Sequence, residues 1–162
     1  MTNDYPSGTT ANARRRFAAG PQRLWRAFTR PEDMATWMWG RDATNAHATA
    51  DLRVGGAYSV YCDGSAEPGW PSDRWGRLGT YIDVVPERRL VYTLHWDAPV
   101  VYNQEGKVVT DEVLIVTFEQ DGDGTIVSVD HIGIPDSGDA NIEHGKALAH
   151  ELDTLASLVE QP

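Results

Sequence analysis

Two runs of the sequence, residues 79–96 and 112–131, constrain the fold of this chain more than any other feature. Each run contains two apolar segments of strand length that are separated by a short turn. The turns are Pro86-Glu87-Arg88 in the first run and Asp121-Gly122-Asp123-Gly124 in the second. Because Pro, Gly and Asp favour turns, and Asp-Gly between apolar strands is a strong hairpin signal, we predict two β-hairpins in one antiparallel sheet. One face of this sheet is rich in aromatic side chains, so we expect the sheet to enclose a pocket as well as a core.

Alternation along the strands predicts which side chains face inward. In the second arm of the first hairpin, residues 89–97, large residues alternate with smaller or polar ones, so the larger set is expected to face the core. This inward set is Leu90, Tyr92, Leu94 and Trp96. In the first arm, residues 75–85, Tyr81 and Ile82 compete for the inside, and we predict a β-bulge there. In the second hairpin, residues 112–133, the inward set is Leu114, Val116, Phe118, Val127, Val129 and His131.

The rest of the chain reads as shorter elements and one long helix. We predict strands at residues 12–19, 46–53 and 57–62, and short helices that begin at Pro21 and Pro31, because proline is favoured in the first turn of a helix. Residues 139–160 form the longest predicted helix, with Glu151 off its apolar face. That face is expected to contain Gly145, Leu148, Ala149, Leu152, Leu155, Ala156 and Val159. Strands following helices indicate the α+β class, with the long helix across the aromatic face of the sheet.

Length and composition limit the possible functions. The 162 residues predict a disordered N-terminal tail, residues 1–11, and a single domain, residues 12–162. The net charge of −10 argues against nucleic acid as a partner, and the basic run Arg14-Arg15-Arg16 is interpreted as a charged strand edge. A single cysteine, Cys62, excludes an internal disulfide and favours a cytoplasmic location. The chain lacks the long apolar run that membrane insertion requires.

Several motifs, taken in order, resemble the START-like (SRPBCC) superfamily. They lie in residues 15–37, 51–56, 86–92, 113–119, 125–135 and 143–155. The branch is that of homologues of the heat-shock-protein ATPase activator, the AHSA-like proteins, and the resemblance covers about residues 12–160. It implies a helix-grip fold, in which a curved seven-stranded antiparallel sheet wraps around a long C-terminal helix and two short helices follow the first strand. Members bind lipids, hormones, polyketides and other apolar molecules, and some are cyclases, dehydratases or hydrolases.

The sequence departs from these relatives at three places. Relatives often carry Gly-Trp where this chain has Ala147-Leu148. The smaller leucine is expected to enlarge the cavity, or to let another aromatic ring fill the space. Segments 63–74 and 98–111 are longer than expected, and we predict that both act as lids at the mouth of a pocket.

Aromatic residues supply most of the predicted ligand-binding site. The complete predicted set is Trp37, Trp39, Tyr58, Trp70, Trp75, Tyr81, Tyr92, Trp96, Phe118, His131 and Leu148. Plain core packing is the alternative for every aromatic in this set, and it is the preferred interpretation of Phe118. Tyr58, Tyr92 and Trp96 are the most direct candidates for a pocket wall, because each is expected to face inward from the middle of a strand.

Titratable residues leave the chemistry of the site open. His131 is an inward-facing candidate for a general acid or base, although a neutral core histidine bonded to a backbone carbonyl is the favoured alternative. His144 is the second catalytic candidate, with a solvated position in the first helical turn as its alternative. Glu112 is expected to be an exposed carboxylate at a strand end, or an acid with a raised pKa if it is buried. The remaining histidines, His47, His95 and His150, are expected at the surface.

No sequence motif predicts a metal site or a cofactor. The turn at Asp121–Gly124 lacks the later glutamate of a calcium loop. Three functions remain. The first is a soluble binding protein for a small hydrophobic or aromatic molecule, held between the sheet and the C-terminal helix. The second is an enzyme of the polyketide cyclase, dehydratase or hydrolase kind that uses the same cavity. The third is a chaperone-linked interaction protein, ranked last because the eukaryotic activator has an extra N-terminal domain for which this chain leaves no room. We expect a monomer or a weak homodimer.

Overall fold

The computed structural model describes residues 9–40, 43–63, 74–97, 112–134 and 140–161. The elements in chain order are β1 (Thr9–Phe17), α1 (Pro21–Thr29), α2 (Pro31–Trp37), β2 (Thr44–Ala50), β3 (Ala57–Asp63), β4 (Trp75–Val85), β5 (Arg89–Asp97), β6 (Glu112–Asp121), β7 (Gly124–Ile134) and α3 (Ala140–Val159).

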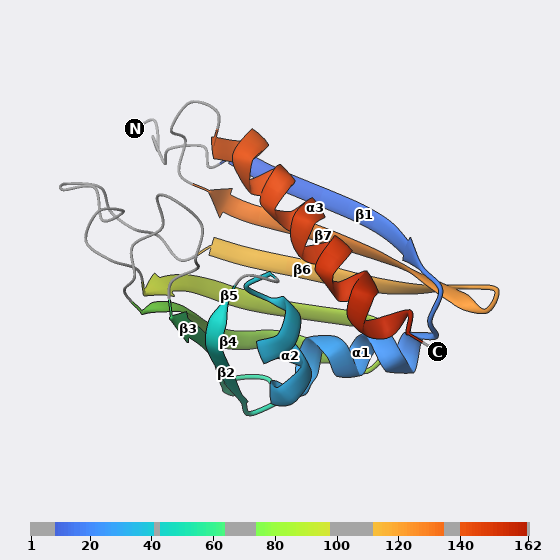
Figure 1. The fold of residues 1–162 in the computed structure, drawn as a ribbon, viewed down its shortest axis with the longest axis horizontal. Helices are drawn as coiled ribbons and strands as arrows, with labels where there is room; N and C mark the ends of the chain where they lie inside the picture. Colours follow the sequence, from blue (N-terminus) through green and yellow to red (C-terminus); the bar gives the residue numbers. More distant parts are fainter. Residues whose placement is uncertain (1–8, 41–42, 64–73, 98–111, 135–139, 162) are drawn as a thin grey trace, which may run out of the picture.

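The strands form one sheet that grips the C-terminal helix. Among the described residues it has seven strands in the order β1-β7-β6-β5-β4-β3-β2, and every neighbouring pair is antiparallel. Helix α3 crosses one face of the curved sheet diagonally, and α1 and α2 cover the same face beside it (Figure 1). The predicted α+β class and helix-grip fold are therefore confirmed.

Both predicted hairpins are present with their expected turns. The first pairs β4 with β5, and its register shifts between Tyr81 and Asp83, which confirms the predicted bulge. The bulge buries Tyr81 (2% exposed) and leaves Ile82 outside (48% exposed), which resolves their competition for the core. The second hairpin pairs β6 with β7 and turns at Gly122, whose φ of 61° is an angle that glycine adopts without strain.

Helix α3 buries an apolar face against the sheet, with two corrections to the prediction. Its buried side chains are Leu148, Leu152, Thr154, Leu155, Ala156 and Val159. Ala149, predicted on that face, is exposed. Glu151, predicted off that face, points inward to an ion pair with Arg77. The buried face is therefore the predicted stripe without Ala149, with Glu151 added beside it.

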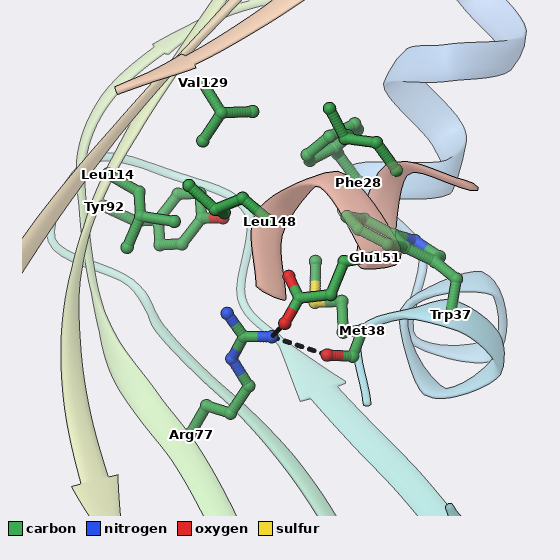
Figure 2. A pocket seen from close by; sticks show the side chains of 10 residues that line it. Phe28, Trp37, Met38, Arg77, Tyr92, Leu114, Val129, Leu148 and Glu151 are labelled. Atoms are coloured by element: carbon green, nitrogen blue, oxygen red, sulfur yellow. Dashed lines mark hydrogen bonds and ion pairs between the residues drawn. The ribbon is translucent and has the colours of Figure 1, made fainter. Parts of the chain in front are cut away.

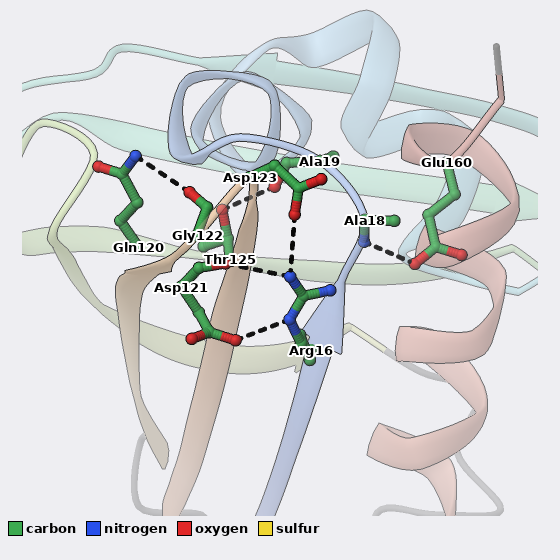
Figure 3. Close-up of polar contacts among 9 residues, drawn as sticks. All are labelled: Arg16, Ala18, Ala19, Gln120, Asp121, Gly122, Asp123, Thr125 and Glu160. Carbon is green, nitrogen blue, oxygen red and sulfur yellow. Dashed lines mark hydrogen bonds and ion pairs between the residues drawn. The ribbon is translucent and has the colours of Figure 1, made fainter.

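Strand β1 is an edge strand, as the basic run predicted. It begins at Thr9, so residues 9–11, which were expected in a disordered tail, belong to the sheet, and Ala11 is buried. The charges of the run have local partners: Arg15 pairs with Asp153 of α3. Arg16 contacts Asp121 and Asp123 at the turn of the second hairpin (Figure 3), which fastens this end of the hairpin to β1.

One predicted strand differs in its bounds, and the predicted lids lie largely outside the described residues. The strand predicted at residues 46–53 is β2, which ends earlier, at Ala50. The predicted lids lie outside the described residues apart from the ends of the first, Asp63 and Arg74, and Trp70 is outside them too. Among the described helices, none combines the length and apolar character needed to cross a lipid bilayer.

Candidate functional site

A small cavity lies between the inner face of the sheet, the end of α2 and helix α3 (Figure 2). Its lining residues are Phe28, Trp37, Met38, Arg77, Tyr92, Leu114, Val129, Leu148, Glu151 and Leu152. The free space is about 10 Å³, which is room for about one water molecule. The predicted enlargement beside Leu148 is therefore absent. Three aromatic rings, those of Phe28, Trp37 and Tyr92, line the same cavity as the leucine.

Regular secondary structure positions the walls of this cavity. Tyr92 of β5 and Leu114 of β6 are paired across the sheet, so their side chains share the inner face. On α3, Leu148, Glu151 and Leu152 lie three and four residues apart, which places them on one side of the helix. The cavity therefore has a sheet wall that is apolar apart from Arg77, and a helix wall that carries one carboxylate.

Arg77 of β4 ties the sheet to both α2 and α3 inside the cavity. Its Nη1 donates hydrogen bonds to the backbone oxygen of Met38 at 2.5 Å and to Oε1 of Glu151 at 3.0 Å (Figure 2). The side chain of Arg77 is 7% exposed and that of Glu151 is 18% exposed. The guanidinium carbon also lies 5.3 Å from the ring centre of Trp96 and 5.6 Å from that of Trp39, both within the range of cation–π attraction.

The ionisation of this pair depends on Glu151. Burial lowers the pKa of Arg77, but Glu151, Tyr92 and Tyr58 together raise it by more, so the net shift is upward and the guanidinium stays protonated. Burial raises the pKa of Glu151, and Arg77 opposes that rise. The Glu151 carboxylate is thus held by one strong hydrogen-bond donor in surroundings that otherwise disfavour its charge.

A second buried polar group lies beside the cavity and corrects two expectations. Glu112, expected to be an exposed strand-end carboxylate, is buried. Its Oε2 accepts hydrogen bonds from Trp96 Nε1 at 2.8 Å and from His131 Nε2 at 2.7 Å. His131 faces inward as predicted, but its partner is this carboxylate instead of the expected backbone carbonyl. A buried carboxylate needs such donors, and the strand pairing supplies both of them.

His144, in the first half of α3, faces this second group. Its ring centre lies 5.3 Å from that of His131, and the two rings meet edge to face. His144 is half-buried, so it is not the fully solvated residue of the alternative interpretation. The remaining histidines, His47, His95 and His150, are exposed, as predicted.

Three tyrosines pack together on the inner face. Tyr58 lies with its ring centre 5.5 Å from that of Tyr81 and 5.2 Å from that of Tyr92. The Tyr58 hydroxyl donates to the backbone oxygen of Thr93 at 2.6 Å, while the buried Tyr81 hydroxyl has no hydrogen-bond partner among the described residues. Burial raises the pKa of all three phenols, to about 12 for Tyr92, so they stay protonated at neutral pH.

The predicted site residues separate into three groups. Trp37, Tyr92 and Leu148 line the cavity. A second group lies on the same side of the sheet without lining it: Trp39, Tyr58, Trp75, Tyr81, Trp96 and His131. Phe118 packs with Trp25 and Phe28, at ring-centre distances of 5.6 and 5.3 Å, and is part of the core as preferred.

Sequence interpretation missed the charged residues of the cavity. Arg77 alternates inward with Trp75 and Gly79 on β4, so strand periodicity contained the signal, but arginine was not considered a core residue. Glu151 follows Leu148 by three residues, which is also a same-face spacing. Within the described residues, His, Cys, Asp and Glu form no cluster of three or more that is suited to a metal ion.

Comparison with known proteins identifies similar chains. The family model described as Activator of Hsp90 ATPase homolog 1-like protein matches residues 18–160. Protein CV1439 from Chromobacterium violaceum is 26% identical, with a TM-score of 0.75 over 94% of this chain and 98% of that chain. The AHSA1-like protein from Aeromonas hydrophila is 17% identical, with a TM-score of 0.73 over 94% and 92% of the two chains. DynU16, from the dynemicin biosynthetic locus, is 16% identical, with a TM-score of 0.68 over 94% of this chain and 47% of that chain. A comparison with curated proteins gives no match.

Proposed function

This chain belongs to the family of activator of Hsp90 ATPase homolog 1-like proteins, and we propose that it binds a small hydrophobic or aromatic molecule between its sheet and helix α3. The observation that carries the proposal is the cavity lined by aromatic and aliphatic side chains, with a single ion pair among them. Ligand sites in proteins are mostly apolar and contain a few fixed polar groups, and this lining has that composition.

The free space of about 10 Å³ requires the cavity to expand when a ligand binds. Typical ligand pockets have volumes of roughly 300–1,000 Å³. Met38 and Leu148 are the adaptable side chains of the wall, because an unbranched methionine has several rotatable bonds and a leucine on a helix can change rotamer. Expansion costs packing energy, so the ligand has to bury enough apolar surface to offset it.

The comparison with DynU16 supports a small-molecule role. Its gene lies in a biosynthetic locus, and the 47% of DynU16 that this chain covers has the same fold as this chain. At 16% identity this likeness concerns the fold alone, so the ligand of this chain is inferred from its own cavity.

A second candidate function, an enzyme of the polyketide cyclase, dehydratase or hydrolase kind, is favoured by the Glu112–His131 pair. A carboxylate that accepts from one nitrogen of a histidine fixes the ring and its tautomer, which is how many catalytic histidines are held. An aromatic polyketide would be turned over by the wild type, and His131→Ala would bind it without turnover. Binding with no turnover by the wild type would reject this candidate.

Ligand-induced stabilisation tests the binding function. Mass spectrometry of the natively purified protein is expected to show a bound apolar metabolite, and melting temperatures are measured across a panel of neutral aromatic compounds. At a ligand concentration of a hundred times Kd, stabilisation is about 2.7 kcal/mol. Leu148→Trp, which fills the cavity, is expected to lose that response, while Leu52→Trp at an exposed loop position keeps it. A wild-type protein with no bound metabolite and no response to the panel would refute the proposal.

A further inference from the structure

Arg77 is a buried cation with hydrogen-bonding capacity to spare. Its two hydrogen bonds to described residues both use Nη1, although a guanidinium carries five N–H groups on three nitrogens. In Figure 2, a guanidinium nitrogen with no dashed line points toward the side of the cavity where Tyr92 and Leu148 lie. The cavity therefore presents a cationic donor to anything that enters it.

The two partners of Arg77 differ in how firmly they are held. The Met38 oxygen belongs to the backbone at the end of α2 and is fixed by the helix, whose Met38 N–H bonds to Met34. Glu151 is a flexible side chain on α3, it makes one hydrogen bond to the guanidinium, and 18% of its side chain is exposed. A partly exposed side chain can rotate toward water, whereas the backbone oxygen cannot.

Resting on the proposed function, we propose that the ligand is an aromatic carboxylate whose carboxylate replaces that of Glu151 on Arg77. A planar carboxylate matches the guanidinium fork and can form two parallel hydrogen bonds, where Glu151 forms one. The exchange leaves Arg77 with one carboxylate partner before and after binding, so no buried charge is left uncompensated. The ring of the ligand then lies against Tyr92, Leu114 and Leu148.

The exchange also accounts for the small free space. Arg77 and Glu151 connect β4 to α3 across the cavity, so the ion pair occupies part of the space between sheet and helix. When Glu151 turns toward water, its own volume becomes available to the ligand, and the direct tie between sheet and helix is released. The same rotation of Glu151 thus opens the cavity and frees Arg77 to bind the carboxylate of the ligand.

Two probes with the same ring test this inference. These are 2-naphthoate and its uncharged amide, 2-naphthamide, with binding measured by calorimetry at pH 7.5. The wild type is expected to bind the carboxylate about tenfold or more tightly than the amide, the value of a charged hydrogen bond. Glu151→Gln, which removes the competing carboxylate, is expected to tighten 2-naphthoate binding and leave 2-naphthamide nearly unchanged.

The variants of Arg77 separate specificity from folding. The single variant Arg77→Gln leaves the Glu151 carboxylate buried beside a neutral group, and this variant can fail to fold. Binding is therefore also measured for the double variant Arg77→Gln/Glu151→Gln, which removes both charges. The double variant is expected to bind both probes equally, and Arg53→Gln, an exposed arginine, is expected to keep the wild-type preference. Equal binding of both probes by the wild type, or 2-naphthoate binding that Glu151→Gln does not tighten, overturns the inference and leaves the binding function standing. If neither probe nor any member of the neutral panel binds, the proposed function itself fails.

Discussion

Replacing Glu112 by alanine is expected to destabilise the protein by about 3–5 kcal/mol, although the residue occupies the first position of a strand. The reason is that its carboxylate is the partner of two inward-facing donors. Trp96 Nε1 and His131 Nε2 both bond to the same oxygen, at 2.8 and 2.7 Å. Removing an exposed carboxylate at a strand end would change the free energy of unfolding very little. The Glu112→Ala variant therefore distinguishes a buried Glu112 from an exposed one.

The magnitude follows from counting the donors that lose their partner. A buried donor left without an acceptor costs about 1–3 kcal/mol, so two donors give about 2–6 kcal/mol. Trp96 is half-buried, so water replaces part of its lost hydrogen bond, whereas His131 is fully enclosed. The sum therefore lies in the middle of that range.

Urea unfolding of a double-mutant cycle measures this contribution. The cycle comprises wild type, Glu112→Ala, His131→Ala and the double variant, and we expect a coupling energy of about 1–3 kcal/mol. Glu119→Ala, an exposed carboxylate on the same strand, is the matched control and is expected to change stability by less than about 0.5 kcal/mol. If Glu112→Ala costs no more than Glu119→Ala, or if the coupling vanishes, the reasoning about a buried carboxylate–histidine pair is wrong.

Three other perturbations examine the same interior. Leu148→Ala should cost about 2–5 kcal/mol in urea unfolding, because Leu148 is packed against the cavity, and the exposed Leu52→Ala should cost far less; equal costs would mean that the site is not packed. Burial raises the pKa of Cys62 to about 11, so at pH 8 a thiol reagent should label the native protein about a hundredfold more slowly than the urea-unfolded chain, and equal rates would contradict this. Burial raises the pKa of Glu151, so its stabilising contribution is complete below the unfolded value of 4.5 and is lost as the pH rises through the folded value. The stability of the wild type relative to Glu151→Gln should therefore fall with rising pH, by at most about 1.4 kcal/mol per pH unit, and an increase would show that attraction to Arg77 outweighs burial.

Local signals were sufficient to predict the hairpins. The turn residues at Pro86–Arg88 and Asp121–Gly124 act on their own neighbours, and alternation within each arm assigns the faces without knowledge of any partner. Even the bulge followed from two adjacent apolar residues, Tyr81 and Ile82, that cannot both face inward. Features whose cause lies within about ten residues of chain are therefore readable from the sequence.

The polar groups of the interior depend on partners that are distant in sequence. Glu151 turns inward because Arg77, 74 residues away in the sequence, lies opposite it. The residues close to Glu151 in the sequence contain no pattern that predicts this partner. Glu112 shares the inward register with Leu114, so alternation did place it on the inner face, but the general cost of burying a carboxylate made exposure the better expectation. Hydrogen bonds from the side chains of His131 on β7 and Trp96 on β5 reverse that expectation. The alternation within β6 gives no sign of these two donors, because they belong to other strands.

The distribution of polarity along the sheet indicates which end of the interior is functional. At the end near α1, the inner face is mostly apolar: Val116, Phe118 and Val127 are buried there, and the hydroxyl of the buried Thr125 donates to the backbone oxygen of Ala19. At the other end, the same face carries Arg77 and Glu112, each of which is costly to bury and is stabilised only by precise partners. Replacing buried charged pairs by apolar residues of similar size is often neutral or stabilising, so a buried charge is weak evidence for a role in stability. Departures from simple core packing concentrate at functional sites, and here the departures adjoin the cavity that is lined by Arg77 and Glu151. A ligand that enters from this end meets Arg77 before it meets the apolar half of the core, which is the order that recognition of an anionic group followed by burial of a ring requires.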